Sequence, residues 1–190
     1  MIAFKKNYFF IIEDIKYINL KKIKRNKKYI LIYRNKENID DLDALKRFRK
    51  NCKLKFIKFY VANDIKLAIA LNADGIYISA SNKSFKSLIL RKKNFNIIGS
   101  AHNFKEIDHK LRQGCRSILV SKLFTVDYAK RSVFLGIIKF NNLFNYCKFI
   151  VPLGGIKLSN LNYLKNVRSN SFAILTELKK KPANIVNRLF

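Results

Sequence analysis

Tryptophan is absent from this 190-residue sequence, and cysteine (three residues) and proline (two) are scarce. The cysteines are widely spaced, and no CxxC or Cys/His ligand pattern accompanies them, which argues against a disulfide framework and a zinc site. They predict reduced, buried thiols in a cytoplasmic protein. No apolar run approaches the ~18 residues of a membrane span, and no small-residue cleavage site follows the short apolar run near the N-terminus. We therefore expect neither a membrane segment nor a signal peptide.

Acidic residues are also few, with 12 Asp and Glu against 40 Lys and Arg, which gives a formal net charge of +28. Such a charge suggests nucleic acid or an anionic membrane as a partner. Composition offers a simpler explanation, because Lys, Asn, Ile, Phe and Tyr, which AT-rich codons encode, supply more than half of the chain. The cations are also spread along the whole sequence. We therefore expect no nucleic-acid and no membrane partner, and a basic nucleic-acid-binding protein is the less favoured alternative.

The chain is predicted to form one domain over residues 1–190, because no Gly/Ser linker, repeat or low-complexity tail divides it. Eight short apolar runs, rich in β-branched and aromatic residues, follow one another along it. They are continuous rather than alternating, which is typical of parallel strands buried on both faces. The runs are Tyr8–Ile12, Tyr29–Tyr33, Phe56–Ala62, Gly75–Ile78, Asn96–Gly99, Ser117–Val120, Phe149–Leu153 and Phe172–Leu175.

Amphipathic segments that predict helices lie between these runs. Apolar residues recur in them at helical spacing, at Ile39–Leu42–Leu45–Phe48, Ile65–Ala68–Ile69, Phe104–Ile107–Leu111 and Leu161–Leu164–Val167. Asn72 and Gly114 are placed to end the second and third of these helices, and Ser159 to cap the fourth. Eight strand and helix units predict a single (β/α)8 TIM barrel. An open doubly wound sheet is the alternative, but no Gly-rich first turn favours it.

The carboxyl ends of barrel strands are where chemistry collects. After the second strand, Arg34 and Lys36 are separated by one residue, so both can project towards an anion such as a phosphate. A solvated pair of cations is the alternative. After the third strand, Asp64 can either hold Mg²⁺ or cap the helix that begins at Ile65, and we favour the cap.

The tandem glycines Gly154 and Gly155 follow the seventh strand, in a chain that has only six glycines. Glycines at such a place let backbone N–H groups approach an anion closely. Barrels commonly build a phosphate site from the loops after strands seven and eight. We therefore predict a phosphate site here, with a plain turn as the alternative.

Other polar residues at strand ends are weaker candidates. His102, at the end of the fifth strand, indicates either a cap or a group for proton transfer. Lys122, Thr125 and Lys130 lie on the segment after the sixth strand, whose length suggests a lid or binding loop. No nucleophilic triad, Walker motif or dinucleotide-binding motif is present.

Taken in order, these segments resemble the thiamine phosphate synthase/TenI family over nearly the whole chain, from Phe9 to about Leu178. The order and spacing of the motifs make the resemblance specific. Five stretches carry it: Tyr33-Arg-Asn-Lys36 against the family's Q-x-R-x-K, Ala62–Ile78 against N-D-R-x-D-L-A…G-A-D-G-V-H-L, Ile97–His102 against I-I-G-x-S-x-H, Gly154-Gly155-Ile156 against A-L-G-G-I, and Phe172–Leu175 against G-V-A-V-I.

The resemblance implies an enzyme that joins hydroxymethylpyrimidine pyrophosphate to a thiazole phosphate, giving thiamine phosphate and pyrophosphate. Its partners are then these two small phosphorylated substrates. The catalytic residues that it implies are Arg34, Lys36 and Ser100. Mg²⁺ is the implied cofactor, with Asp64 as its ligand. The implied pyrophosphate ligands are Arg34, Lys36, Asn63 and Lys130, and the implied thiazole phosphate ligands are Thr125, Gly154, Gly155, Leu175 and Thr176.

Several positions depart from the family pattern, among them Ile32 in place of its Gln and a one-residue offset at Ala62-Asn63-Asp64, and two further departures bear on the type of reaction. Where the family has a second metal-binding carboxylate, after the fourth strand, this chain has Asn82. Where TenI proteins have a catalytic histidine, after the sixth strand, it has Lys122. A TenI-like thiazole phosphate tautomerase, or a protein that only binds thiazole phosphate, is therefore the alternative function.

Overall fold

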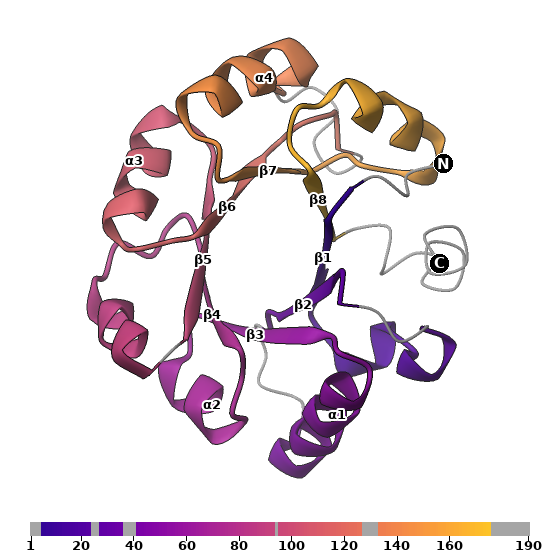
Figure 1. The fold of residues 1–190 in the computed structure, drawn as a ribbon, viewed down its shortest axis with the longest axis vertical. Coiled ribbons are helices and arrows are strands. Elements are labelled where there is room, and N and C mark those ends of the chain that lie inside the picture. The colour runs from indigo at the N-terminus through magenta and orange to yellow at the C-terminus, as the bar shows by residue number, and fades with distance from the viewer. Residues whose placement is uncertain (1–4, 24–26, 36–40, 94, 127–132, 176–190) are drawn as a thin grey trace.

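The computed structural model describes residues 5–23, 27–35, 41–93, 95–126 and 133–175. Within them, eight parallel strands pair in chain order and the last returns to the first, which closes a barrel (Figure 1). This closed order confirms the predicted (β/α)8 barrel and excludes the open sheet. The strands are β1 (Asn7–Ile12), β2 (Tyr29–Tyr33), β3 (Lys58–Ala62), β4 (Gly75–Ile78), β5 (Asn96–Ala101), β6 (Ser117–Ser121), β7 (Ile150–Leu153) and β8 (Ser171–Ile174).

Helices surround the ring of strands, as the view down the barrel in Figure 1 shows. The α-helices are α1 (Leu42–Leu54), α2 (Ile65–Ala70), α3 (Phe104–Arg112) and α4 (Gly136–Tyr146). Short 3₁₀ helices take the outer positions elsewhere: η1 (Ile15–Tyr17), η2 (Leu20–Lys22), η3 (Lys86–Lys93) and η5 (Leu158–Asn166). None of the described helices is long and apolar enough to cross a membrane.

Helix boundaries follow the predicted signals at two of three places. Asn72 (φ 47°) and Gly114 (φ 79°) adopt the left-handed conformation just after α2 and α3. The prediction that Ser159 caps a helix is wrong, because η5 begins one residue before it, at Leu158. Asn160 supplies the contact instead, since its Oδ1 accepts a hydrogen bond from the backbone N–H of Lys157 at 2.8 Å.

The core has two parts, one inside the barrel and one between the strands and the helices. Alternate residues of each strand point inward, which explains why the strands are apolar without a break. The inward-pointing side chains are Phe9, Ile11, Ile30, Ile32, Tyr60, Tyr77, Ile98, Leu119, Val151 and Ala173. On the outside, Ile69 and Phe104 are 44% and 46% exposed, although helical spacing assigned them to buried faces. Phe104 packs instead on the ring of Tyr146, with ring centroids 4.3 Å apart.

The three cysteines belong to the core. Cys52, Cys115 and Cys147 are free and buried, as predicted. Burial raises the pKa of the Cys52 and Cys115 thiols to about 12, so they are protonated and unreactive at neutral pH.

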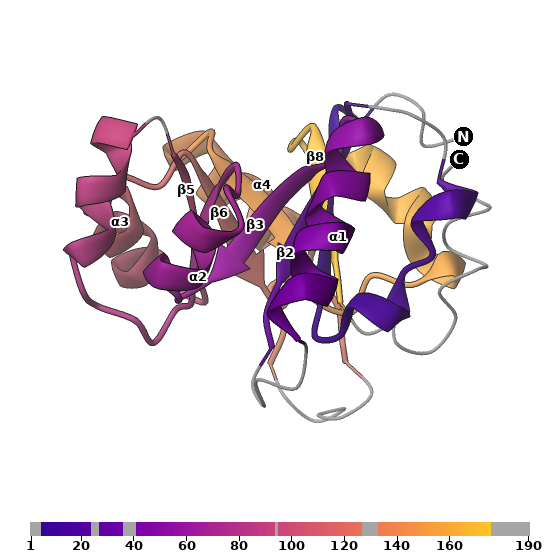
Figure 2. The same cartoon turned by 90° about the horizontal axis from the view of Figure 1, so that it is seen from below.

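Because all strands are parallel, their carboxyl ends lie on one side of the barrel, the side to which the β3 arrow points in Figure 2. This side carries the candidate functional residues.

Candidate phosphate-binding site

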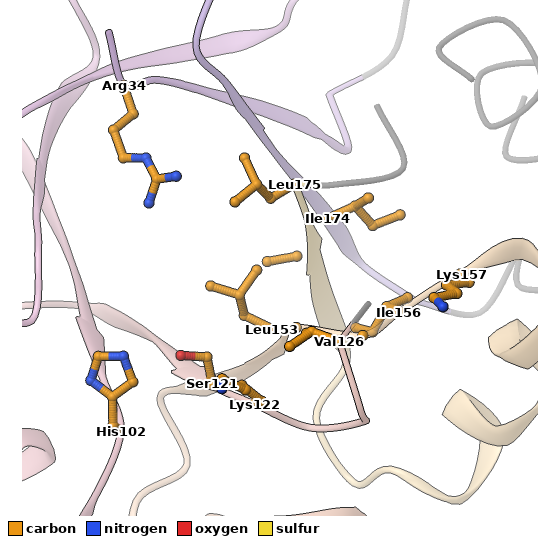
Figure 3. Close-up of a pocket in the computed structure, with 13 residues that line it drawn as sticks. Arg34, His102, Ser121, Lys122, Val126, Leu153, Ile156, Lys157, Ile174 and Leu175 are labelled. Carbon is orange, nitrogen blue, oxygen red and sulfur yellow. The ribbon is translucent and has the colours of Figure 1, made fainter. Parts of the chain in front are cut away.

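A pocket of about 170 Å³ opens at the carboxyl ends of the strands. Residues at or just after the carboxyl ends of β2, β5, β6, β7 and β8 line it, and Figure 3 shows side chains converging from different sides of the barrel. Its polar side chains are Arg34, His102, Ser121, Lys122 and Lys157, and its apolar wall is formed by Val126, Leu153, Ile156, Ala173, Ile174 and Leu175. A cationic rim over an apolar wall suits a ligand that has both a phosphate and a ring.

Arg34 is fixed at the pocket by its backbone and by an ion pair. Its N–H donates to the Ile12 carbonyl at 2.8 Å, which extends the β1–β2 pairing by one residue. One guanidinium NH2 group donates to Glu13 Oε1 at 2.8 Å, and both side chains are about three-quarters buried. Arg34 Nε is buried and has no hydrogen-bond partner. A buried N–H without a partner is costly, so this donor is available to an anion in the pocket.

Ser100 lies behind this rim rather than on the pocket wall. It is 7% exposed, and its hydroxyl hydrogen-bonds the phenol of Tyr77, which points into the barrel. Burial raises the pKa of Tyr77, although Ser100 and the nearby Arg34 lower it in part. The phenol is therefore neutral. Sequence reasoning did not single out Tyr77, which lies within the predicted strand Gly75–Ile78, or Glu13, which follows the first apolar run.

The glycine turn after β7 forms the opposite wall. Gly154 (φ 92°) and Gly155 (φ 68°) both have left-handed backbones. A Cβ at Gly155 would meet the Thr125 carbonyl oxygen at 2.5 Å and the Phe124 carbonyl oxygen closer still. Only glycine fits between these carbonyls. The turn thus presents bare backbone to the pocket beside Leu175, and the structure brings together Gly154, Gly155 and Leu175, three of the five residues predicted to hold the thiazole phosphate.

Two other predicted ligands that the structure describes do not line this pocket. Thr125 lines a separate groove on the outer surface with Phe134 and Tyr163. Asn63 belongs to a polar network at the ends of β3 and β4, outside the pocket wall. Three further residues, Lys36, Lys130 and Thr176, lie outside the described part of the chain.

Asp64 acts as the N-cap of α2, as sequence reasoning favoured. Its Oδ1 accepts the backbone N–H of Leu67 at 2.9 Å. The neighbouring amides are occupied by one another, since Asn63 Oδ1 accepts from the Ser79 N–H at 3.0 Å and from Asn82 Nδ2 at 3.2 Å. No group of three or more His, Cys, Asp or Glu gathers to hold a metal among the residues described. One engaged carboxylate among paired amides does not fit a Mg²⁺ site, which favours several free carboxylate oxygens.

Fold and site together define a (β/α)8 barrel with a cationic, glycine-walled pocket at the carboxyl ends of its strands. A family model described as thiamine monophosphate synthase matches residues 17–178. The chain belongs to this family.

Individual relatives agree with this assignment. The chain is 29% identical over 180 residues to a thiamine-phosphate synthase of Prochlorococcus marinus, a match that covers 92% of this chain and 48% of the relative. It is 29% identical over 163 residues to a thiamine-phosphate synthase of Pelagibacter ubique, covering 80% of this chain and 76% of that one. The chain spans about half the length of the Prochlorococcus relatives that it matches.

Solved structures of similar shape show the fold alone, because their sequences have diverged. A thiamine phosphate pyrophosphorylase from Pyrococcus furiosus superposes with a TM-score of 0.73 at 15% identity, over 100% of both chains. A 3-keto-L-gulonate-6-phosphate decarboxylase from Vibrio cholerae reaches 0.62 at 12% identity, over 98% of this chain and 99% of that one.

Proposed function

We propose that the chain couples hydroxymethylpyrimidine pyrophosphate with a thiazole phosphate, forming thiamine phosphate and releasing pyrophosphate. The observation that carries this proposal is that Arg34, with its unpartnered Nε, lines the same pocket as Gly154 and Gly155. Two separate anion-binding elements suit two phosphorylated substrates. Family membership supports the same chemistry.

The reaction needs stabilisation of a leaving group rather than a nucleophilic side chain. The bond between the pyrimidine methylene carbon and the pyrophosphate oxygen breaks, and its electron pair leaves with pyrophosphate. Arg34 faces the negative charge that develops there, with Lys36 as its predicted companion. The thiazole nitrogen then captures the pyrimidine carbocation. Backbone N–H groups at Gly154 and Gly155 hold the thiazole phosphate, and the apolar wall near Leu153 and Ile156 receives the rings.

A direct test mixes the purified protein with both precursors and measures thiamine phosphate and pyrophosphate over time, with Mg²⁺ present and absent. We expect equal amounts of the two products. Arg34→Met removes the charge facing pyrophosphate, so we expect a rate at least about 100-fold lower. Lys46→Met is the control, because Lys46 pairs with Asp43 on the outer surface of α1. No product at high protein concentration would refute the proposal.

A TenI-like tautomerase or a thiazole phosphate binder is the second candidate. The observation that favours it is the paired amide network of Asn63 and Asn82, which occupies the place of metal-binding carboxylates. This candidate predicts a higher melting temperature with thiazole phosphate, but no increase with pyrophosphate and Mg²⁺. A rise with both ligands supports the synthase instead.

A further inference from the structure

A histidine and a glutamate form a pair at the edge of the pocket. His102 Nδ1 lies 3.0 Å from Glu106 Oε2, and the same oxygen accepts the His102 backbone N–H at 2.8 Å. Glu106 is itself held in place, because its N–H donates to Oδ1 of Asn103, the N-cap of α3, at 2.9 Å. The first turn of α3 thus fixes the carboxylate, and the carboxylate fixes the imidazole.

The charge state of Glu106 determines which ring nitrogen of His102 is available to a ligand. Burial alone would raise the pKa of Glu106, but the hydrogen bonds from His102 and the charges of His102 and Lys83 outweigh it, so the pKa is lowered. An ionised carboxylate only accepts hydrogen bonds, so Nδ1 of His102 carries its proton towards Glu106. The opposite ring nitrogen, Nε2, is therefore the one available to a ligand.

His102 is the side chain in this pocket that is best suited to give up a proton. A guanidinium group such as that of Arg34 stabilises negative charge without transferring a proton. Serine hydroxyls are far weaker acids than an imidazolium, and an ordinary lysine ammonium is weaker as well. Figure 3 shows the His102 ring and the Arg34 guanidinium extending into the same space from neighbouring sides of the barrel.

The residues at the strand ends leave part of the charge of the departing pyrophosphate to be neutralised by a proton donor. Departing pyrophosphate carries several negative charges, and the described residues do not form a carboxylate site for a metal that would balance them. Asn63 and Asn82 contribute neutral amides that bond to each other. The charge must then be met by cations of the protein and by proton transfer.

We infer that His102, oriented by Glu106, is the general acid that protonates pyrophosphate as it leaves. This role rests on the proposed coupling reaction. As the carbon–oxygen bond breaks, its electron pair goes to the pyrophosphate oxygen, and the Nε2 proton moves to pyrophosphate. His102 is left neutral and takes its next proton from water. Glu106 is a positioning residue, since it acts through the imidazole.

The experiment measures single-turnover coupling in the full chain with His102→Asn, Glu106→Gln and His109→Asn. His109 is the matched control, because it is the only other histidine of the sequence and does not line the pocket. It lies within α3, whereas His102 precedes that helix, and it contacts the Phe85 ring and the Lys83 carbonyl. We expect His102→Asn to slow coupling about 100-fold, Glu106→Gln to slow it less, and His109→Asn to leave it within about twofold of wild type.

Two readouts separate proton donation from a structural role. The first readout uses two substrate analogues in which the oxygen that bridges the two phosphorus atoms is replaced by CH2 or by CF2. The CF2 diphosphate is the better leaving group, so its substrate reacts faster. Protonation by a general acid reduces this difference in rate. We expect the CF2 to CH2 rate ratio to be at least about tenfold larger in His102→Asn than in wild type. The wild-type rate should fall at alkaline pH, and His102→Asn should lack that fall. The charged groups facing this site are Glu106, Lys83, Arg34 and Lys122.

The outcomes are distinguishable. Absence of product in the wild type overturns the proposed function, and this inference with it. Product formation with equal rates in His102→Asn and His109→Asn overturns the inference alone. A slower His102→Asn with an unchanged rate ratio and an unchanged pH profile also overturns it, because His102 then only shapes the pocket.

Discussion

Replacing Gly155 by alanine tests whether the glycine turn is built as the structure indicates. Gly155 has a left-handed backbone (φ 68°), which costs alanine about 1–2 kcal/mol. The new Cβ would also meet the Phe124 and Thr125 carbonyl oxygens, which the Phe124 N–H bond to the Gly154 carbonyl (3.1 Å) holds close. Moving these carbonyls adds the loss of about one hydrogen bond, ~1 kcal/mol, and local strain. We expect Gly155→Ala to lower the free energy of unfolding by about 3 kcal/mol.

Gly136→Ala provides the matched control. Gly136 is also left-handed (φ 69°), but a Cβ there meets only the Phe134 ring, at 3.9 Å. The cost of Gly136→Ala is therefore only that of the left-handed backbone, about 1–2 kcal/mol. Urea unfolding followed by circular dichroism gives both values. Affinity for thiazole phosphate, measured by calorimetry, should fall about tenfold or more in Gly155→Ala and stay near wild type in Gly136→Ala. Equal unfolding free energies in the two variants would refute this description of the turn.

Three further substitutions probe the barrel and its rim. Arg34→Lys should weaken pyrophosphate binding about tenfold in calorimetry, because one ammonium cannot pair with Glu13 and also offer a second planar donor to the ligand. An unchanged affinity for pyrophosphate would show that the guanidinium does not bind it. Gly75→Ala should lower the free energy of unfolding by more than about 3 kcal/mol, since its Cβ would overlap the Asn96 carbonyl and lie 2.5 Å from the Tyr60 ring; a small effect in urea unfolding contradicts the β4 packing. Burial lowers the pKa of the fully buried Lys110 to about 8, from the ordinary value of 10.5. Between these two pH values the unfolded chain binds more protons than the folded chain, so the free energy of unfolding rises with pH. The stability of wild type relative to Lys110→Met should accordingly increase by up to about 3 kcal/mol over that range, and a pH-independent difference would rule this out.

The barrel was predictable because its strands are buried on both faces. Continuous runs such as Tyr29–Tyr33 and Gly75–Ile78 match the observed strands to the residue. The helices around the barrel were less predictable than its strands. η5 has helical apolar spacing but forms a 3₁₀ helix, and its first turn depends on Asn160, which bonds both the Gly155 carbonyl and the Lys157 N–H. These bonds are local, three and five residues apart in sequence, but they come from a polar side chain that apolar periodicity does not mark.

The candidate site was predictable where one residue at a strand end carries the signal. Arg34, Gly154 and Gly155 are cases of this kind, since a cation or a tandem glycine at a strand end is informative by itself. The pairings were not predictable. Glu13 acquires its role from Arg34, 21 residues away, and Tyr77 from Ser100, 23 residues away. Both contacts exist only once neighbouring strands pair, β1 with β2 and β4 with β5.

A crystal structure of the protein with thiamine phosphate and pyrophosphate bound tests the central claim most directly. The account predicts the thiamine phosphate group on the backbone of Gly154 and Gly155, and pyrophosphate on Arg34 in the same pocket, within reach of His102. Ligands bound only in the outer groove beside Thr125 and Tyr163, or a pocket left empty at saturating ligand, would contradict it.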